Sequence, residues 1–255
     1  MRGLWHRYGL AALFLLAMIA VWEAVIRAFD VPKYLFPAPS QVALALRDDW
    51  SAYLAPATWV TMNEIVLGFV IAAVTGVALA IILHMFGPLR RAVYPLLIGS
   101  QTIPIVVLAP ILVIVLGFGL TPKLVIIALI CFFPIVVNGL DGLRSVDDEL
   151  IHMMRTLDAS RWAIFKRIEF PSALPAIFSG LRVAATFAAI GAVFGEFSGA
   201  SAGLGYVIQQ ATPNLQTARI FGAIVILSLI AFALFALVSL LERIFVPWAP
   251  RGNAM

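Results

Sequence analysis

The chain is 255 residues long, with 63% hydrophobic and 12% charged residues and a mean hydropathy of +1.04. Soluble domains carry roughly 25% charged residues, so this composition excludes a soluble globular protein and predicts an all-α integral membrane protein. The formal net charge is +4, but the basic residues are distributed as a membrane topology signal, so we expect no nucleic-acid partner.

The first two apolar stretches are each long enough to cross a membrane, which takes about 20 residues. Residues 8–28 form the first predicted span, in which Glu23 and Arg27 are spaced to pair on one helix face. No small-residue cleavage site precedes Glu23, which favours an uncleaved span over a signal peptide. Residues 57–84 form the second predicted span, where Gly68 and Gly76 permit close helix packing.

The third apolar stretch, residues 92–117, carries no charge but is interrupted by prolines. The three prolines are Pro95, Pro104 and Pro110. Because an interior proline removes a backbone donor and clashes with the preceding turn, we expect a broken or kinked span that ends near Gly117 and Gly119.

Three further spans are predicted at residues 124–140, 173–197 and 220–241. Residues 198–217 lack charge but are too rich in Gly, Gln, Thr and Asn to cross lipid, so we expect a loop with a short re-entrant helix. Arg182, about two turns inside the fifth span, is expected to reach toward the cytoplasm or to contact the neighbouring loop.

The Lys and Arg residues predict the orientation of these spans. With six spans and both termini in the cytoplasm, most of the 17 basic residues lie on the inner side. The outer ones are Arg27, Lys33, Arg47, Lys123 and Arg219. This strong bias predicts a multi-pass protein and places residues 141–172 in the cytoplasm.

The segment 141–172 differs from the spans because it is rich in charge. Its apolar residues recur at near-helical spacing, which predicts short amphipathic helices beyond the membrane whose apolar faces need a cover. Composition alone allows two covers: another protein in the cytoplasm, or the lipid headgroups of the membrane surface.

Residues 155–162, RTLDASRW, resemble the R-T-L-G-A-S-R-W found in a cytoplasmic loop of bacterial ATP-binding-cassette (ABC) importer permeases, in the nitrate, sulfonate and taurine branch. The family pattern of this loop is E-A-A, three residues, G, nine residues and I-x-L-P. When it is aligned on Ile168 and Pro171, the family glycine falls on Asp158 and E-A-A falls on residues 152–154. Other strings resemble the same branch in order: LFPAPSQV (35–42), LGFVIAAVTGVALAIIL (67–83), FFPIVVNGLDGLRSVDDEL (132–150), LPAIFSGLRVAATFA (174–188), GEFSGASAGLGYVI (195–208) and LERIFVPW (241–248).

The resemblance implies a six-helix, MetI-like permease fold in the bacterial inner (plasma) membrane. Residues 1–255 would be one transmembrane permease domain, 141–172 its cytoplasmic coupling loop, and Arg155 to Phe165 the coupling helix. The implied partners are a second permease copy, a pair of cassette ATPase subunits that hold ATP and Mg²⁺, a periplasmic or lipid-anchored substrate-binding protein, and membrane lipid. The coupling residues carried over are His152, Arg155, Thr156, Leu157, Asp158, Ala159, Ser160, Arg161, Trp162, Phe165 and Pro171.

Two residues depart from the family pattern. A glycine at the loop position favours a sharp turn with positive φ, and aspartate is among the few residues that tolerate this conformation, so Asp158 is expected to keep the turn at a modest cost. His152 stands where the family has glutamate, which removes a permanent negative charge. We expect the loop to function with both changes.

Several kinds of enzyme site are missing from the sequence. No G-x-x-x-x-G-K-[ST] phosphate loop occurs, and the three histidines are widely separated, so we expect no nucleotide, metal or catalytic residue in this chain. ATP hydrolysis is expected in a separate subunit. The single cysteine, Cys131, allows no intrachain disulfide and is expected to be a small buried apolar residue.

Two other function classes stay open as alternatives. A secondary transporter without an ATPase needs a coupling-ion site and usually related halves, but no repeat relates residues 1–128 to 129–255. A membrane-embedded enzyme needs clustered acids or histidines. The acidic run at residues 147–149 is interpreted as a solvated helix start, because neighbours in a helix point in different directions.

Polar residues inside the spans are the candidates for contact with a transported solute, since they face lipid only at high cost. They are Asn63, Glu64, Gln101, Thr102, Asn138 and Glu196. The competing interpretation is that each makes an interhelical hydrogen bond or is solvated at the interface. The resemblance implies a small organic solute, either an anion such as a sulfonate, taurine or nitrate or a heterocycle such as a pyrimidine or riboflavin.

Overall fold

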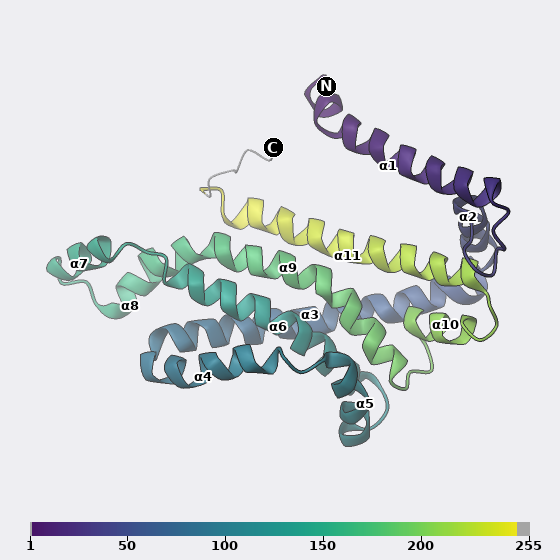
Figure 1. The fold of residues 1–255 in the computed structure, drawn as a ribbon. Coiled ribbons are helices and arrows are strands. Elements are labelled where there is room, and N and C mark those ends of the chain that lie inside the picture. The colour runs from purple at the N-terminus through teal and green to yellow at the C-terminus, as the bar shows by residue number, and fades with distance from the viewer. Residues whose placement is uncertain (1, 249–255) are drawn as a thin grey trace. The chain divides into compact units, whose positions relative to one another are not determined.

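The computed structural model describes residues 2–248, with side chains for residues 9, 10 and 12–248. Regular structure in these residues is entirely helical (Figure 1). The helices in chain order are α1 (Arg2–Ala28), α2 (Pro39–Asp48), the π-helix η1 (Trp50–Leu54), α3 (Ala55–Met85), α4 (Gly87–Ser100), α5 (Ile105–Leu116), α6 (Leu120–Leu143), α7 (Asp148–Thr156), α8 (Arg161–Ile164), the π-helix η2 (Phe165–Glu169), α9 (Phe170–Phe197), α10 (Leu204–Ala211) and α11 (Thr217–Phe245).

Four uninterrupted helical stretches in the described residues are long and apolar enough to cross a membrane. They are Trp50–Met85, Leu120–Leu143, Arg161–Phe197 and Thr217–Phe245. The pair α4 and α5 gives a fifth candidate if it is one broken span. Helix α1 covers the first expected span, 8–28, although the side chains at 8 and 11 lie outside the described residues.

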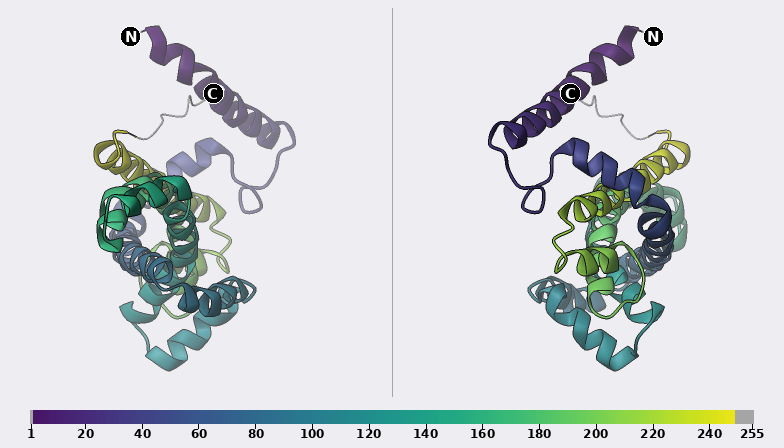
Figure 2. Two further views of the ribbon diagram at one scale, coloured as in Figure 1. Left: turned by 90° about the vertical axis from the view of Figure 1, so that its left-hand side faces the viewer. Right: turned by 90° about the vertical axis from the view of Figure 1, so that its right-hand side faces the viewer.

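The predicted break in the third span is confirmed. Helices α4 and α5 are separated by residues 101–104 and meet at an angle of 101° (Figures 1 and 2). Pro104 lies at the N-terminal boundary of α5, and α5 ends at Leu116, next to Gly117 with φ +80°. Only glycine adopts such a conformation readily, so the chain turns here as the sequence predicts.

Two predicted spans lie within longer helices. The fourth helix begins at Leu120 rather than at residue 124, and the fifth helical stretch begins at Arg161 rather than at residue 173. The segment 161–169 contains several charged residues but is helical. Ile164 and Phe165 bury their side chains, which gives the segment an apolar face. The helix α10 confirms the short helix expected within 198–217.

The described chain forms two compact units. One contains residues up to 60 together with 202–227. In it, the Glu23 carboxylate accepts hydrogen bonds from the backbone amide of Ser40 (3.0 Å) and from its hydroxyl (2.8 Å), which links α1 to the start of α2. The expected pair of Glu23 with Arg27 is also present, at 2.7 Å.

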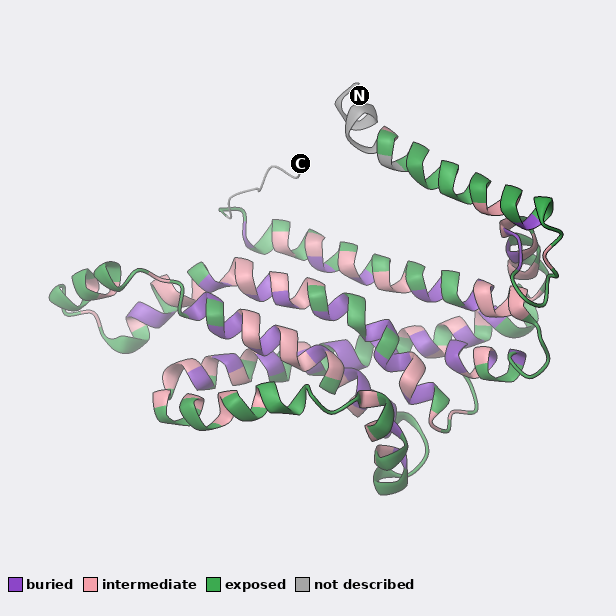
Figure 3. Ribbon diagram, in the orientation of Figure 1, coloured by how far each residue is buried: buried purple, intermediate pink, exposed green. Residues whose placement is uncertain are grey.

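The other unit contains residues 61–201 and the residues from 228 onward. Its centre is the packing of α6 against α9 and α3, and Figure 3 shows buried residues along α6 and α9. Glycines allow these close approaches: a Cβ on Gly180 would lie 2.7 Å from the carbonyl oxygen of Pro134, and one on Gly68 would lie 2.6 Å from Ile127. Cys131 is buried in this core and its thiol donates to the carbonyl of Ala184.

Candidate functional site

The charged loop begins with a capped helix. The Asp147 side chain accepts a hydrogen bond from the backbone amide of Glu149 at 2.9 Å, and α7 starts at the next residue, Asp148. An aspartate at the N-cap accepts a hydrogen bond from one of the free amides at a helix start, and its negative charge interacts favourably with the positive end of the helix dipole. The interpretation of the acidic run as a solvated helix start is therefore confirmed.

Helix α7 ends in a turn centred on Asp158, whose φ is +55°. The amide of Asp158 donates to the carbonyl of Arg155 and the amide of Ala159 donates to the carbonyl of Met154, both at 3.0 Å. This pair of hydrogen bonds around one left-handed residue is a Schellman motif, in which glycine is the usual residue. The expectation that Asp158 adopts a sharp turn with positive φ is confirmed.

A new helix starts directly after this turn. The Ser160 hydroxyl accepts a hydrogen bond from the amide of Ala163 at 3.2 Å and caps α8. The sequence resemblance predicted one helix from Arg155 to Phe165, and this prediction is wrong. These residues form the end of α7, a turn, the whole of α8 and the first residue of η2. The reason is the left-handed residue at 158, which an uninterrupted α-helix cannot contain.

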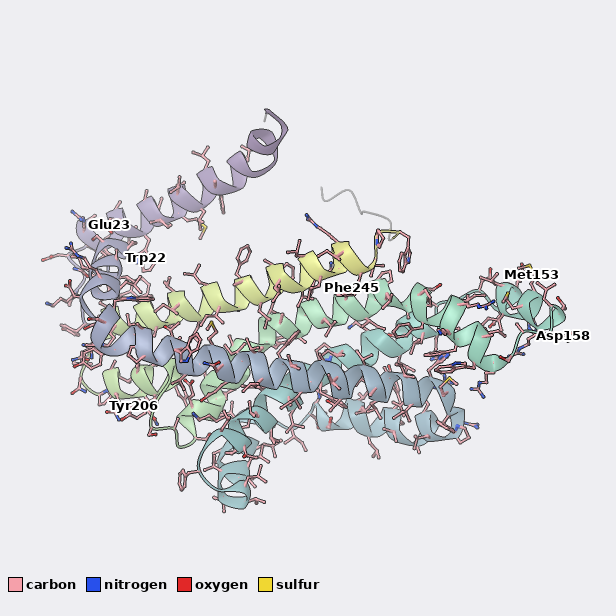
Figure 4. The ribbon with its side chains drawn as sticks, turned by 180° about the vertical axis from the view of Figure 1, so that it is seen from behind. Trp22, Glu23, Met153, Asp158, Tyr206 and Phe245 are labelled. Carbon is pink, nitrogen blue, oxygen red and sulfur yellow. The ribbon has the colours of Figure 1, made fainter. Side chains whose placement is uncertain are left out.

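Apolar side chains project from this polar loop. Leu157 is 70% exposed, Trp162 is 62% exposed and Met153 is 52% exposed. We call these three residues the loop surface; Met153 and Asp158 are labelled in Figure 4. Trp162 also stacks on the buried ring of Phe165, with centroids 5.3 Å apart, so the exposed indole is held in place from below.

The other expected coupling residues lie in α7, in α8 and at the start of α9. His152 and Arg155 are exposed on α7, and the Thr156 hydroxyl donates to the carbonyl of Met153. Pro171 lies in the first turn of α9, directly after the π-turn η2. The remaining loop residue, Arg161, reaches back to α3 and donates to the carbonyl of Met85 at 2.6 Å.

The structure brings two of the expected solute-contact residues together in a buried cluster. Glu64 on α3 accepts a hydrogen bond from Lys123 on α6 at 2.6 Å, and Glu196 on α9 accepts one from Thr61 at 2.6 Å. The Glu196 carboxyl also lies next to the Glu64 carboxyl. All four residues are buried, so the cluster joins three helices through charge-assisted hydrogen bonds.

Of the other four candidates, three are exposed and one bonds within its own helix. Gln101 and Thr102 are exposed in the break between α4 and α5, and Asn63 is exposed on α3. Asn138 donates its side-chain amide to the carbonyl of Pro134 within α6, at 2.7 Å.

Sequence reasoning missed the partners of the buried charges. Lys123, expected on the outer side, is buried in the first turns of α6. Arg182 pairs with Glu242 of α11 rather than with the neighbouring loop. The available signal was the high cost of an isolated charge inside a span, which requires a partner but does not identify it.

Comparison with known protein families identifies the family of this chain. Residues 64–249 match the family described as the inner membrane component of binding-protein-dependent transport systems. The chain belongs to this family. The match covers the helices and the loop described above, from the buried cluster to the end of α11.

Two relatives in the binding-protein-dependent family are similar over almost their whole length. The formylaminopyrimidine transport permease protein ThiX of Halalkalibacterium halodurans is 36% identical over 92% of this chain and 94% of its own. The riboflavin transport system permease protein RibX of Chloroflexus aurantiacus is 35% identical over 96% and 91%. An inward-facing structure of the MetNI methionine ABC transporter shares the fold, with a TM-score of 0.60 at 20% identity over 73% of this chain and 95% of that chain.

As a member of this family, the chain is a permease subunit of an ABC importer and not an enzyme subunit. Its several apolar helices are those of an inner-membrane permease.

Proposed function

We propose that this permease crosses the inner membrane six times, with both termini and the segment α7–α8 in the cytoplasm. The proposal counts α1, the four long helical stretches and the broken pair α4 and α5 as spans. It is supported by the Lys and Arg bias of the sequence, which places the charged loop inside.

We propose that the segment α7–α8 docks a cassette ATPase through the loop surface. Met153, Leu157 and Trp162 are apolar, and each is more than half exposed on a segment that also carries many charged residues. Exposed apolar residues gathered on a polar segment mark interaction sites. We assign each copy of a permease homodimer one ATPase subunit, which binds ATP and Mg²⁺. A substrate-binding protein is the further partner, on the outer face.

Transport would then proceed by alternating access. ATP brings the two ATPase subunits together, the docked loops move with them, and the helices shift between inward-open and outward-open packing. Such a shift requires that ATP-bound ATPases bind the two packings with different affinity.

Copurification tests the docking role of the loop surface. The tagged permease is purified with the ATPase encoded beside it, as wild type, as a Leu157→Asp/Trp162→Asp variant, and as an Arg167→Asp control in the same exposed segment. We expect the wild type and the control to retain the ATPase and the double variant to lose it. Equal retention by all three would refute docking at this surface.

We further propose that the solute is a small heterocycle of the aminopyrimidine or flavin class. Support comes from the relatives, because those with 36% and 35% identity are described as formylaminopyrimidine and riboflavin permeases. Of the six sequence candidates, Gln101 and Thr102 are the ones we place on the solute path, since they are exposed where the third span breaks. Glu64 and Glu196 use their carboxylates within the buried cluster.

The solute class is tested in proteoliposomes that contain the permease, its ATPase and its binding protein. Formylaminopyrimidine, riboflavin, taurine and an alkanesulfonate are compared for their ability to stimulate ATP hydrolysis and to be taken up. Stimulation by a heterocycle alone supports the proposal. Stimulation by taurine or the sulfonate alone contradicts it and returns the solute to the anion class.

A further inference from the structure

Two polar contacts connect the loop to the end of α3. Neither is one of the hydrogen bonds that form the turn at Asp158 or cap α8. The Arg161 guanidinium donates from Nη2 to the carbonyl oxygen of Met85 at 2.6 Å. Nε2 of His84 lies 2.9 Å from Oε2 of Glu169, and both of these side chains are largely buried. Arg161 begins α8 and Glu169 ends η2, so the two contacts hold both ends of this short segment.

The contact of Arg161 fits the chemistry of a helix end. The last carbonyls of a helix have no intrahelical partner, and a cation near them is favoured by the helix dipole. Met85 is the last residue of α3, and Phe86, which follows it, is the N-cap of α4. Arg161 therefore holds the corner at which α3 turns into α4.

Apolar packing supports the same connection. Phe165 belongs to a buried cluster with Leu143, Ala173 and Ile177, and this cluster packs against Val77, Ile81 and Met85 of α3. The segment α8–η2 thus lies on α3 through both polar and apolar contacts. Trp162, on the loop surface, lies in the same short helix α8 as Arg161, so a partner that moves this helix moves both residues.

The covalent path from the loop into the membrane is less regular than this lateral path. Between α8 and α9 the helix passes through the π-turn η2, in which hydrogen bonds run from residue i to i+5. Such turns interrupt the regular helix and occur frequently at functional sites. Helix α3, in contrast, runs without interruption from Met85 back to Glu64, which pairs with Lys123 of α6.

We infer that Arg161 is a positioning residue that transmits the movement of the ATPase-bound loop to the end of α3, with the His84–Glu169 pair as the second attachment. The inference rests on the proposed function and specifies a route within it. Movement at the loop is carried laterally into α3 and from there to α6 through the buried cluster, in addition to the path along α9. Energetic coupling of this kind runs through packed and hydrogen-bonded contacts between rigid elements.

The test compares Arg161→Gln with Arg167→Gln, which makes the same substitution in the same exposed segment. Each variant is reconstituted with its ATPase and binding protein, and three quantities are measured: ATPase retention, basal ATP hydrolysis, and solute taken up per ATP hydrolysed. For Arg161→Gln we expect normal retention, normal basal hydrolysis and an uptake per ATP reduced about tenfold, within the usual range of coupling between sites. Arg167→Gln should match the wild type.

A second readout separates transmission from simple stability. Deuterium uptake at residues 76–86 is compared between the resting complex and the complex trapped with ATP and vanadate. It should change on trapping in the wild type and in Arg167→Gln, and stay unchanged in Arg161→Gln. Arg161→Lys should restore most of the solute uptake per ATP hydrolysed, because a single carbonyl acceptor does not require the bidentate geometry of arginine.

The outcomes distinguish the inference from the proposed function. If the wild-type permease retains no ATPase, the proposed function fails and the inference falls with it. If every complex assembles and Arg161→Gln transports like the wild type, only the inference is overturned. Loss of the ATPase from Arg161→Gln alone also overturns it, since Arg161 would then be a docking residue.

Discussion

Replacing Lys123 with methionine should destabilise the protein strongly, because it leaves buried carboxylates without their cation. The Lys123 and Glu64 side chains are 10% and 4% exposed, and Glu196 beside them is completely buried. Methionine keeps the length and the apolar stem of lysine. Removal of one partner from a buried ion pair costs about 3–5 kcal/mol of unfolding free energy. At roughly 2–4 °C per kcal/mol for a chain of this size, the midpoint of thermal unfolding should fall by about 10 °C.

The buried thiol of Cys131 provides the assay. It lies in the core between α6 and α9, so a thiol-reactive fluorophore reports unfolding of this core in detergent. Lys166→Met, which makes the same substitution at an exposed lysine, is the control and should unfold at the wild-type midpoint. A Glu64→Gln/Lys123→Met variant should recover at least half of the lost stability, because the neutral amide at position 64 needs no cation. An unchanged midpoint for Lys123→Met would refute the argument that the pair is buried and mutually required.

Three further changes test other contacts of the fold. Asp158→Gly should stabilise the end of α7 by up to about 1 kcal/mol, and Asp158→Val should destabilise it by roughly 1–2 kcal/mol, because only glycine is free of strain at positive φ; hydrogen exchange at the amides of 158 and 159 measures both, and equal rates would contradict the turn geometry. Gly180→Ala should cost about 1–3 kcal/mol by overpacking α6 against α9, whereas Gly99→Ala, with no atom within 4 Å of the new Cβ, should leave the unfolding midpoint unchanged. Arg182→Gln should lower the midpoint and Arg182→Gln/Glu242→Gln should lower it less, because the partly buried carboxylate is then no longer unpaired; additive losses would show that the two side chains act independently.

The sequence predicted those features that local chemistry determines. Long apolar stretches predict the long helices, and prolines predict the break between α4 and α5. The left-handed turn at Asp158 could be predicted because the family glycine aligns with a residue that tolerates positive φ. The predicted pair of Glu23 with Arg27 depends only on a spacing of four residues in one helix.

Tertiary packing determined what the sequence could not predict. Lys123 follows two glycine positions and precedes an apolar run, which is typical of a residue at a membrane boundary, and only its pairing with Glu64, 59 positions away, explains its burial. The fifth span was predicted to begin near residue 173 because the charges before it suggested a loop, and the sequence did not indicate that the helix begins at Arg161. The buried faces of Ile164 and Phe165, packed on neighbouring helices, show why the helix continues through them.

The turn at Asp158 shows how a permease of this family can depart from the loop pattern and keep its geometry. The requirement at this position is a backbone conformation, not a side chain, since both hydrogen bonds of the turn come from main-chain amides. Aspartate adopts the conformation at a cost, and Ser160 then caps α8, so that Leu157 and Trp162 are presented on either side of the turn. His152, in contrast, is a side-chain departure from the resemblance, and it lies on the exposed face of α7. If the proposed ATPase docks here, it meets an imidazole at position 152 and a regular left-handed turn at position 158.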